Sequence, residues 1–293
     1  MRGTCKDCPA GNASIVETPG GETKDERSAW YNYPNADTKT RGYVMDLWNT
    51  LDMLKGCKWV ELSHVLNAES PFWSGIPKDS VELCKTVFDY DNPMLRCRIH
   101  TFKFPGQFGT HIDFPVHFVE GGAGPEIFSI EQHVLPLVVI DIRDKVAENP
   151  EYAVTLEDIK AFEAEHGTIP AGTFVALCTG WCHRWPDNDA LNNFDEQGGE
   201  HAPGWSLPVV RFLIEERGVA AIGHETFDTD ASPEAVKEDD LACERLILAS
   251  NRFQVELMNN LDQLPATGAI IFIAYPRIEG ATGLPVRAWA VFE

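Results

Sequence analysis

The chain has 293 residues, 44% of them hydrophobic, and a formal net charge of −21. This is enough apolar sequence for a sizeable core, so a globular protein is expected over most of the length. The acidic charge excludes a basic surface for nucleic acid or anionic membranes, and no apolar run of about 18 residues predicts a membrane span. The cysteines are scattered along the chain, which is typical of reduced thiols in a cytoplasmic protein.

Helices and strands are predicted to alternate after a polar N-terminal region. Residues 1–40 lack periodicity and are expected to form a flexible extension of a single domain, residues 41–293. Periodicity predicts helices over residues 40–55, 155–166, 207–217 and 239–250, and strands over residues 59–64, 96–104, 138–142, 173–178, 218–223, 253–257, 269–274 and 287–292. Several strands follow one another closely, so we expect an α/β fold with some antiparallel pairing.

Residues 107–119 form the most informative segment, because its candidate ligands all occupy odd positions. These are Gln107, His111, Asp113 and His117, and the even positions from Phe108 onward are mostly Phe, Ile or Val. Side chains alternate between the faces of an extended strand, so one face would be anchored in the core while the other collects polar groups. A metal or acid–base site is expected here, and a half-buried strand with incidental histidines is the alternative.

Pro115 is expected to interrupt this strand before His117, because proline cannot donate to a strand ladder. The chain would then turn around the site and bring His117 close to it. A neutral imidazole near a cation is suited to moving protons at neutral pH. His117 is therefore predicted to act as a base and not as a ligand.

The same segment resembles the signature of the metal-dependent cyclase-type hydrolases, His-x-Gly-Thr-His-x-Asp-x-Pro-x-His-Phe. Residues 107–118 match every fixed position except the first, where Gln107 replaces His. The resemblance continues in the family's order through residues 61–73, 179–181, 223–230 and 255–265. It implies a swivelling β/β/α, cyclase-like fold, in which helices pack around a central β-structure in one domain.

The resemblance also implies a divalent metal ion and its ligands. The implied ligands are Gln107, His111, Asp113, Glu244 and Glu256. Glu244 and Gln107 stand where relatives with two zinc ions have His, so two nitrogen donors are replaced by oxygen donors. Oxygen ligands suit Mn²⁺, so Mn²⁺ is the expected ion and Zn²⁺ the next candidate. A solvated helix face is the alternative for Glu244, whereas Glu256 lies in an apolar strand and needs a partner there.

The implied activity is hydrolysis of an amide, formamide, lactam or lactone bond in a small cyclic or aromatic substrate. The metal ion would acidify a water molecule and polarise the carbonyl group, and His117 would take the proton. The side chains that could contact such a substrate are Phe72, Trp73, Trp181 and His224. Ordinary core packing is the alternative for each of them.

Other functions are weighed against hydrolysis. A Gly-x-Ser-x-Gly motif and a nucleotide-binding glycine motif are both missing from the sequence, so covalent serine catalysis and a nucleotide cofactor are not expected. A lyase or isomerase with the same metal remains open, as does a non-catalytic relative that binds metal or a small molecule. Family members are commonly dimers or tetramers, so a homodimer or homotetramer is expected.

Overall fold

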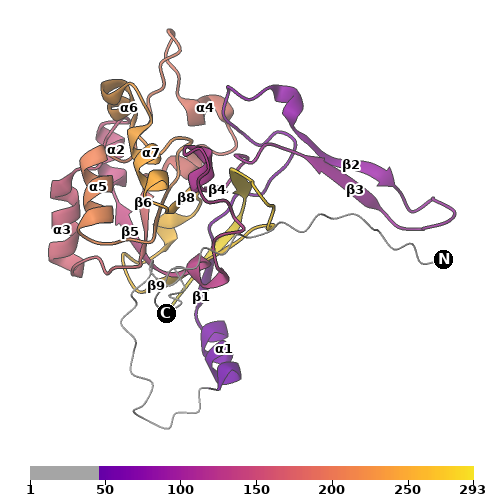
Figure 1. Cartoon of the computed structure of the whole chain (residues 1–293), viewed down its shortest axis with the longest axis horizontal. Helices are drawn as coiled ribbons and strands as arrows, with labels where there is room; N and C mark the ends of the chain where they lie inside the picture. Colours follow the sequence, from indigo (N-terminus) through magenta and orange to yellow (C-terminus); the bar gives the residue numbers. More distant parts are fainter. Residues whose placement is uncertain (1–45) are drawn as a thin grey trace, which may run out of the picture. The chain divides into compact units, whose positions relative to one another are not determined.

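A nine-stranded mixed sheet organises residues 46–293, which are the residues that the computed structural model describes (Figure 1). The predicted extension over residues 1–40 lies outside them. Along the sheet the strand order is β1-β11-β9-β5-β6-β7-β8-β4-β10. The bounds of these strands are β1 Lys58–Glu61, β4 His111–Asp113, β5 Val134–Asp141, β6 Phe174–Cys178, β7 Ala221–His224, β8 Phe253–Glu256, β9 Ala269–Ala274, β10 Gly283–Pro285 and β11 Arg287–Phe292. Strands β5 to β8 run parallel, and the remaining pairs are antiparallel.

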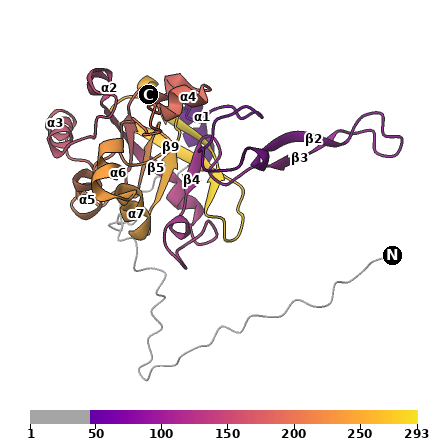
Figure 2. The same cartoon turned by 90° about the horizontal axis from the view of Figure 1, so that it is seen from above.

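Helices cover one face of the parallel strands (Figures 1 and 2). The helices are α2 Arg143–Glu148, α3 Leu156–His166, α4 Asn188–Asn192, α5 Leu207–Glu215, α6 Ser232–Glu238 and α7 Ala242–Ala249. A further helix, α1 Leu47–Gly56, buries no residue and is not part of this layer. Buried side chains from α3, α5 and α7 join those of β5, β6 and β7 in one core, which includes Ile159, Leu213, Ile247, Val175 and Ile222. A strand that is buried on both faces has a continuous run of apolar residues, and such runs are what made these strands predictable from the sequence.

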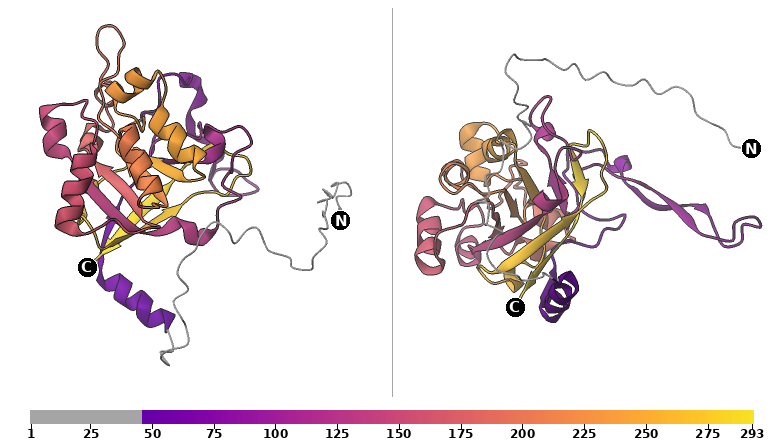
Figure 3. Two further views of the ribbon diagram at one scale, coloured as in Figure 1. Left: turned by 60° about the vertical axis from the view of Figure 1, so that its left-hand side comes forward. Right: turned by 60° about the horizontal axis from the view of Figure 1, so that its bottom comes forward.

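The opposite face of the sheet closes on a second core. This core joins residues from both ends of the strand order, among them Ile112 and Val255 from β4 and β8, and Ile271 and Ala288 from β9 and β11. The sheet therefore curls around its own apolar side chains, as Figure 3 shows for the C-terminal strands. No helix in the described part of the chain is long and apolar enough to cross a lipid bilayer.

A reciprocal pair of hydrogen bonds marks the start of α3. The Thr155 side chain accepts a hydrogen bond from the Asp158 backbone, and the Asp158 carboxylate accepts one from the Thr155 backbone N–H. This reciprocal arrangement satisfies two N–H groups that a helix start leaves without partners.

The signature segment differs from the strand expected over residues 107–119. Only three residues, His111–Asp113, form β4, and Pro115–His117 form a 3₁₀-helix. The interruption expected at Pro115 is thus confirmed, whereas the long alternating strand is wrong. The proline ring favours the first turn of a helix and cannot donate a ladder hydrogen bond.

Strands β2 (Glu82–Phe88) and β3 (Ile99–Lys103) form a separate two-stranded sheet. Figures 1 and 2 both show this hairpin extending away from the nine-stranded sheet. Large apolar side chains on it are exposed, including Val87, Ile99 and Phe102. A two-stranded sheet alone is marginally stable in water, and exposed apolar side chains of this kind are typical of interaction surfaces.

Candidate metal centre

The centre of the site is built from two cross-strand pairs. Strands β4 and β8 run antiparallel, and their register places His111 opposite Glu256 and Asp113 opposite Gln254. Residues two apart share one face of a strand, so these side chains meet on the same side of the sheet. All of them are buried. The ligand atoms of His111, Asp113 and Glu256 lie within 4.8 Å of one another, an arrangement that could hold a metal ion.

The orientation of the His111 ring fits a metal ligand. Its Nδ1–H donates to the Gly109 carbonyl at 2.8 Å, so in the neutral ring Nε2 carries the lone pair. Nε2 is buried and has no hydrogen-bond partner among the described residues, and it lies 3.1 Å from Glu256 Oε2 and 3.4 Å from Asp113 Oδ2. Histidines that bind metals usually donate their other ring N–H to a carbonyl or carboxylate in this way.

Charge at this point also favours a cation. Burial by itself lowers the pKa of His111, but the carboxylates of Asp113 and Glu256 outweigh it and raise the pKa well above its ordinary value. The carboxylates therefore stabilise positive charge at the place where His111 Nε2 points. A divalent ion would meet the same need without a proton on the ring.

Gly109 has a specific reason to be glycine. Its φ is +59°, and a Cβ atom there would clash with Leu66 Cδ2. Because the Gly109 carbonyl holds His111, this tight turn fixes the ring as well as the chain direction.

Gln107 takes part in the site through its amide nitrogen. Gln107 Nε2 donates to Asp113 Oδ1 at 3.0 Å. The amide oxygen would face a metal ion only after the amide turns over. The ligand role of Gln107 stays a prediction.

Glu244 is buried, so the alternative of a solvated helix face is wrong for it. It lies in the first turn of α7, where the Asp230 carboxylate accepts from the backbone N–H groups of Cys243 at 2.8 Å and Glu244 at 3.2 Å. Burial and the carboxylates of Glu256 and Asp113 raise the pKa of Glu244 well above its ordinary value. Its Oε1 lies 3.9 Å from Nε2 of His117, whose side chain is 30% exposed and can be reached from solvent.

Two further carboxyl groups enlarge this acidic cluster. Asp228 and Glu200 share a hydrogen bond; burial raises the pKa of Asp228 to about 6 and that of Glu200 to about 8. The Glu256 carboxylate adds to both shifts. The ionised forms of these carboxyl groups are disfavoured by one another, and a cation in the cluster would stabilise them.

Comparisons with known proteins agree with this geometry. The sequence profile of the Cyclase family matches residues 60–231. The chain belongs to the Cyclase family. It is 35% identical to isatin hydrolase of Roseibium aggregatum over 187 residues, which are 62% of this chain and 70% of that protein.

Solved structures of Cyclase-family enzymes match the fold. Isatin hydrolase A from Ralstonia solanacearum has a TM-score of 0.77 and 31% identity, covering 87% of this chain and 100% of that one. An isatin hydrolase bound to the product analogue thioisatinate has a TM-score of 0.76 and 30% identity, covering 84% of this chain and 99% of that one. The expected α/β cyclase fold is confirmed, and the chain is a metal-dependent hydrolase of C–N bonds.

The residues expected to contact substrate in this Cyclase-family enzyme lie in different surroundings. His224 is fully buried, and its Nε2 lies 3.4 Å from Glu256 Oε1, inside the carboxylate cluster. Trp181 is 2% exposed and belongs to the core under the helices, where its Nε1–H donates to the Leu191 carbonyl at 2.9 Å. Phe72 packs on Phe108 with 6.1 Å between ring centroids, while Trp73 is 54% exposed. Their substrate roles stay predictions.

Sequence reasoning missed Gln254, although a signal for it was present. Gln254 stands two residues before Glu256 on the same strand, so the alternation used for residues 107–119 places both on one face. Asp228 and Glu200 were also missed. Glu200 lies in a loop, where no periodicity relates it to the site.

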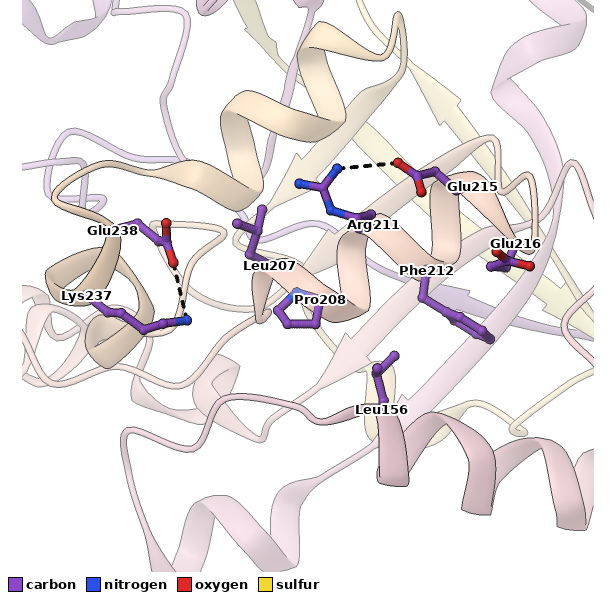
Figure 4. A pocket seen from close by; sticks show the side chains of 9 residues that line it. All are labelled: Leu156, Leu207, Pro208, Arg211, Phe212, Glu215, Glu216, Lys237 and Glu238. Atoms are coloured by element: carbon purple, nitrogen blue, oxygen red, sulfur yellow. Dashed lines mark hydrogen bonds and ion pairs between the residues drawn. The ribbon is translucent and has the colours of Figure 1, made fainter.

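A surface hollow elsewhere on the molecule has a different character (Figure 4). It lies beside α5 and is lined by Leu207 and Phe212, with ion pairs Arg211–Glu215 at 3.4 Å and Lys237–Glu238 at 3.2 Å. None of the metal-centre residues lines it, and four of its five charged side chains form these two ion pairs. It contributes nothing to the chemistry of the site.

Proposed function

We propose that this enzyme hydrolyses the lactam or amide bond of a small cyclic aromatic substrate, with isatin as the first compound to test. The observation that carries the proposal is the buried group of His111, Asp113 and Glu256, whose ligand atoms lie within 4.8 Å of one another. The similarity to isatin hydrolases supports the substrate class. Formamides and lactones are the next substrates to test.

His111, Asp113 and Glu256 would hold the divalent ion, with Gln107 and Glu244 as further oxygen donors. Bound there, the ion would acidify a water molecule and polarise the substrate carbonyl group. Mn²⁺ is proposed before Zn²⁺ because most of these donors are oxygen atoms.

His117 is proposed as the base that takes the proton from the attacking water. It follows β4 directly on the 3₁₀-helix and is partly exposed, so substrate and solvent can reach it. Glu244, 3.9 Å away, would stabilise the imidazolium that forms when His117 accepts the proton. Phe72, Trp73, Trp181 and His224 are proposed to shape the substrate pocket.

The test is elemental analysis of protein purified without chelator, followed by assays with isatin, an aryl formamide and a lactone. We expect near-stoichiometric Mn²⁺ or Zn²⁺, its loss in His111→Ala, and turnover that His117→Ala strongly lowers. A tight ligand without turnover would instead identify a binding protein. Product of unchanged mass would identify an isomerase, and loss of water from the substrate would identify a lyase.

We further propose that the enzyme acts as a cytoplasmic homodimer or homotetramer. The exposed apolar surface of the β2–β3 hairpin supports an assembly, and the unpaired cysteines of the described residues support a reducing compartment. Light scattering of Phe102→Lys beside the unchanged protein tests the assembly, because a charge on a covered surface would dissociate it.

A further inference from the structure

The amide of Gln254 lies between two carboxylates of the candidate metal centre. Its Nε2 is 2.9 Å from Glu256 Oε1 and 3.4 Å from Asp113 Oδ2, and the side chain is fully buried. On Glu256 the amide occupies the oxygen that His111 leaves free, because His111 Nε2 faces Oε2. One neutral group therefore contacts both acidic ligand candidates.

Thr229 contacts the other end of this amide. Its buried hydroxyl donates to Gln254 Oε1 at 2.7 Å and lies 3.3 Å from Glu256 Oε1. If the amide were turned over, its oxygen would face the carboxylates of Asp113 and Glu256 and be repelled by them. The hydroxyl and the two carboxylates together favour a single orientation, with the N–H groups toward the site.

We propose that Gln254 is a positioning residue that sets the metal affinity of this centre, and that Thr229 holds it in its working orientation. The inference rests on the proposed metal-binding role of His111, Asp113 and Glu256. Carboxylates in a buried site repel each other, and the Gln254 N–H groups offset this repulsion without adding charge. They also leave Glu256 Oε2 as the oxygen presented toward His111.

The experiment is calorimetric titration of chelator-treated protein with MnCl₂. Four proteins are compared: the unchanged chain, Gln254→Met, Thr229→Val and Thr229→Ser. Met preserves the length of the side chain without its hydrogen bonds, and Val preserves the shape of Thr without its hydroxyl. We expect Gln254→Met to weaken Mn²⁺ binding by about 10–100-fold, the usual effect of losing a group that orients metal ligands. Thr229→Val should weaken Mn²⁺ binding by a smaller factor. Thr229→Ser keeps the hydroxyl and should bind Mn²⁺ as tightly as the unchanged chain.

Melting of the metal-free forms separates this role from a structural one, because a merely structural residue would lower the melting temperature without changing Mn²⁺ affinity. The electron paramagnetic resonance spectrum of bound Mn²⁺ should change in Gln254→Met if the ligands have moved.

Equal Mn²⁺ affinity in the unchanged protein and in both Gln254→Met and Thr229→Val would overturn the role of Gln254 and leave the metal assignment standing. No Mn²⁺ binding by the unchanged protein would overturn the metal assignment together with it. If Gln254→Met does not fold, the Thr229 pair still decides, since equal affinity in Val and Ser variants would overturn the orienting role.

Discussion

His111 and Glu256 are register partners on neighbouring antiparallel strands, and His111 Nε2 lies 3.1 Å from Glu256 Oε2. The position of the metal centre is therefore set by backbone pairing. A slip of one residue between β4 and β8 would turn these side chains toward the opposite core. The pairing register of β4 and β8 thus determines the distances between the ligand candidates.

Metal removal should lower the stability of the protein. The carboxylates of Asp113, Glu244 and Glu256 repel each other when no cation is present, and a ligand that binds only the folded state stabilises it. Mn²⁺ at about 100 times its Kd should add about 2.7 kcal/mol to the free energy of unfolding. Thermal melting with chelator and with added Mn²⁺ measures this. His111→Ala is the control, and a response of its melting temperature equal to that of the unchanged protein would place the ion elsewhere.

Replacing His117 by Ala should remove the base without removing the metal. Loss of a general base costs about 10²–10⁴-fold in kcat. Mn²⁺ affinity should stay unchanged, because His117 is not among the residues whose ligand atoms converge. Steady-state kinetics and Mn²⁺ titration of the same preparation test both halves. Loss of Mn²⁺ binding in this variant would make His117 a ligand.

Gly109→Ala should be costly both for stability and for the metal centre. A non-glycine residue at φ +59° costs about 1 kcal/mol, and the end of the Leu66 side chain must also move aside for the added Cβ atom. Gly121→Ala is a matched control, because Gly121 also has a positive φ, +74°, but has nothing within 4 Å of the added Cβ. Denaturant unfolding should show a larger loss for Gly109→Ala, and only this variant should bind Mn²⁺ more weakly. Equal losses in both variants would show that the Leu66 contact relaxes freely.

The ion pair between Glu163 and Arg217 should make stability depend on pH. Arg217 Nε lies 2.6 Å from Glu163 Oε1, and this hydrogen bond holds the pKa of Glu163 below its ordinary value. The ionised form is thus favoured by folding, so the contribution is complete above the ordinary pKa of about 4.3 and is lost as the pH falls through the lower folded value. Glu163→Gln should cost about 1–2 kcal/mol at pH 7, and the difference from the unchanged protein should shrink as the pH falls below the ordinary pKa of Glu163. A difference that is constant with pH would assign the loss to packing.

Most of the core elements were predictable from the sequence because their apolar runs are bounded by turn residues. The strands Ala269–Ala274 and Arg287–Phe292 coincide with the predicted ranges. Strand β10, Gly283–Pro285, was missed because three residues carry no periodic pattern. In the site, the motif identified His111 and Asp113 as ligand candidates, while Gln254 became visible only from the strand register. Pairing between residues 141 positions apart, as for Asp113 and Gln254, leaves no local trace in the sequence.

The placement of β4 has a consequence for the order of events during synthesis. Its two neighbours in the sheet, β8 and β10, both come from the C-terminal part of the chain. While the ribosome is still making residues 114–252, the emerged His111 and Asp113 have no strand to pair with, and Glu256 does not yet exist. His111 and Asp113 lie in the first half of the sequence, but the ligand set is complete only after the strands of the last third have been made and have paired with β4. We therefore expect the metal ion to bind late in folding.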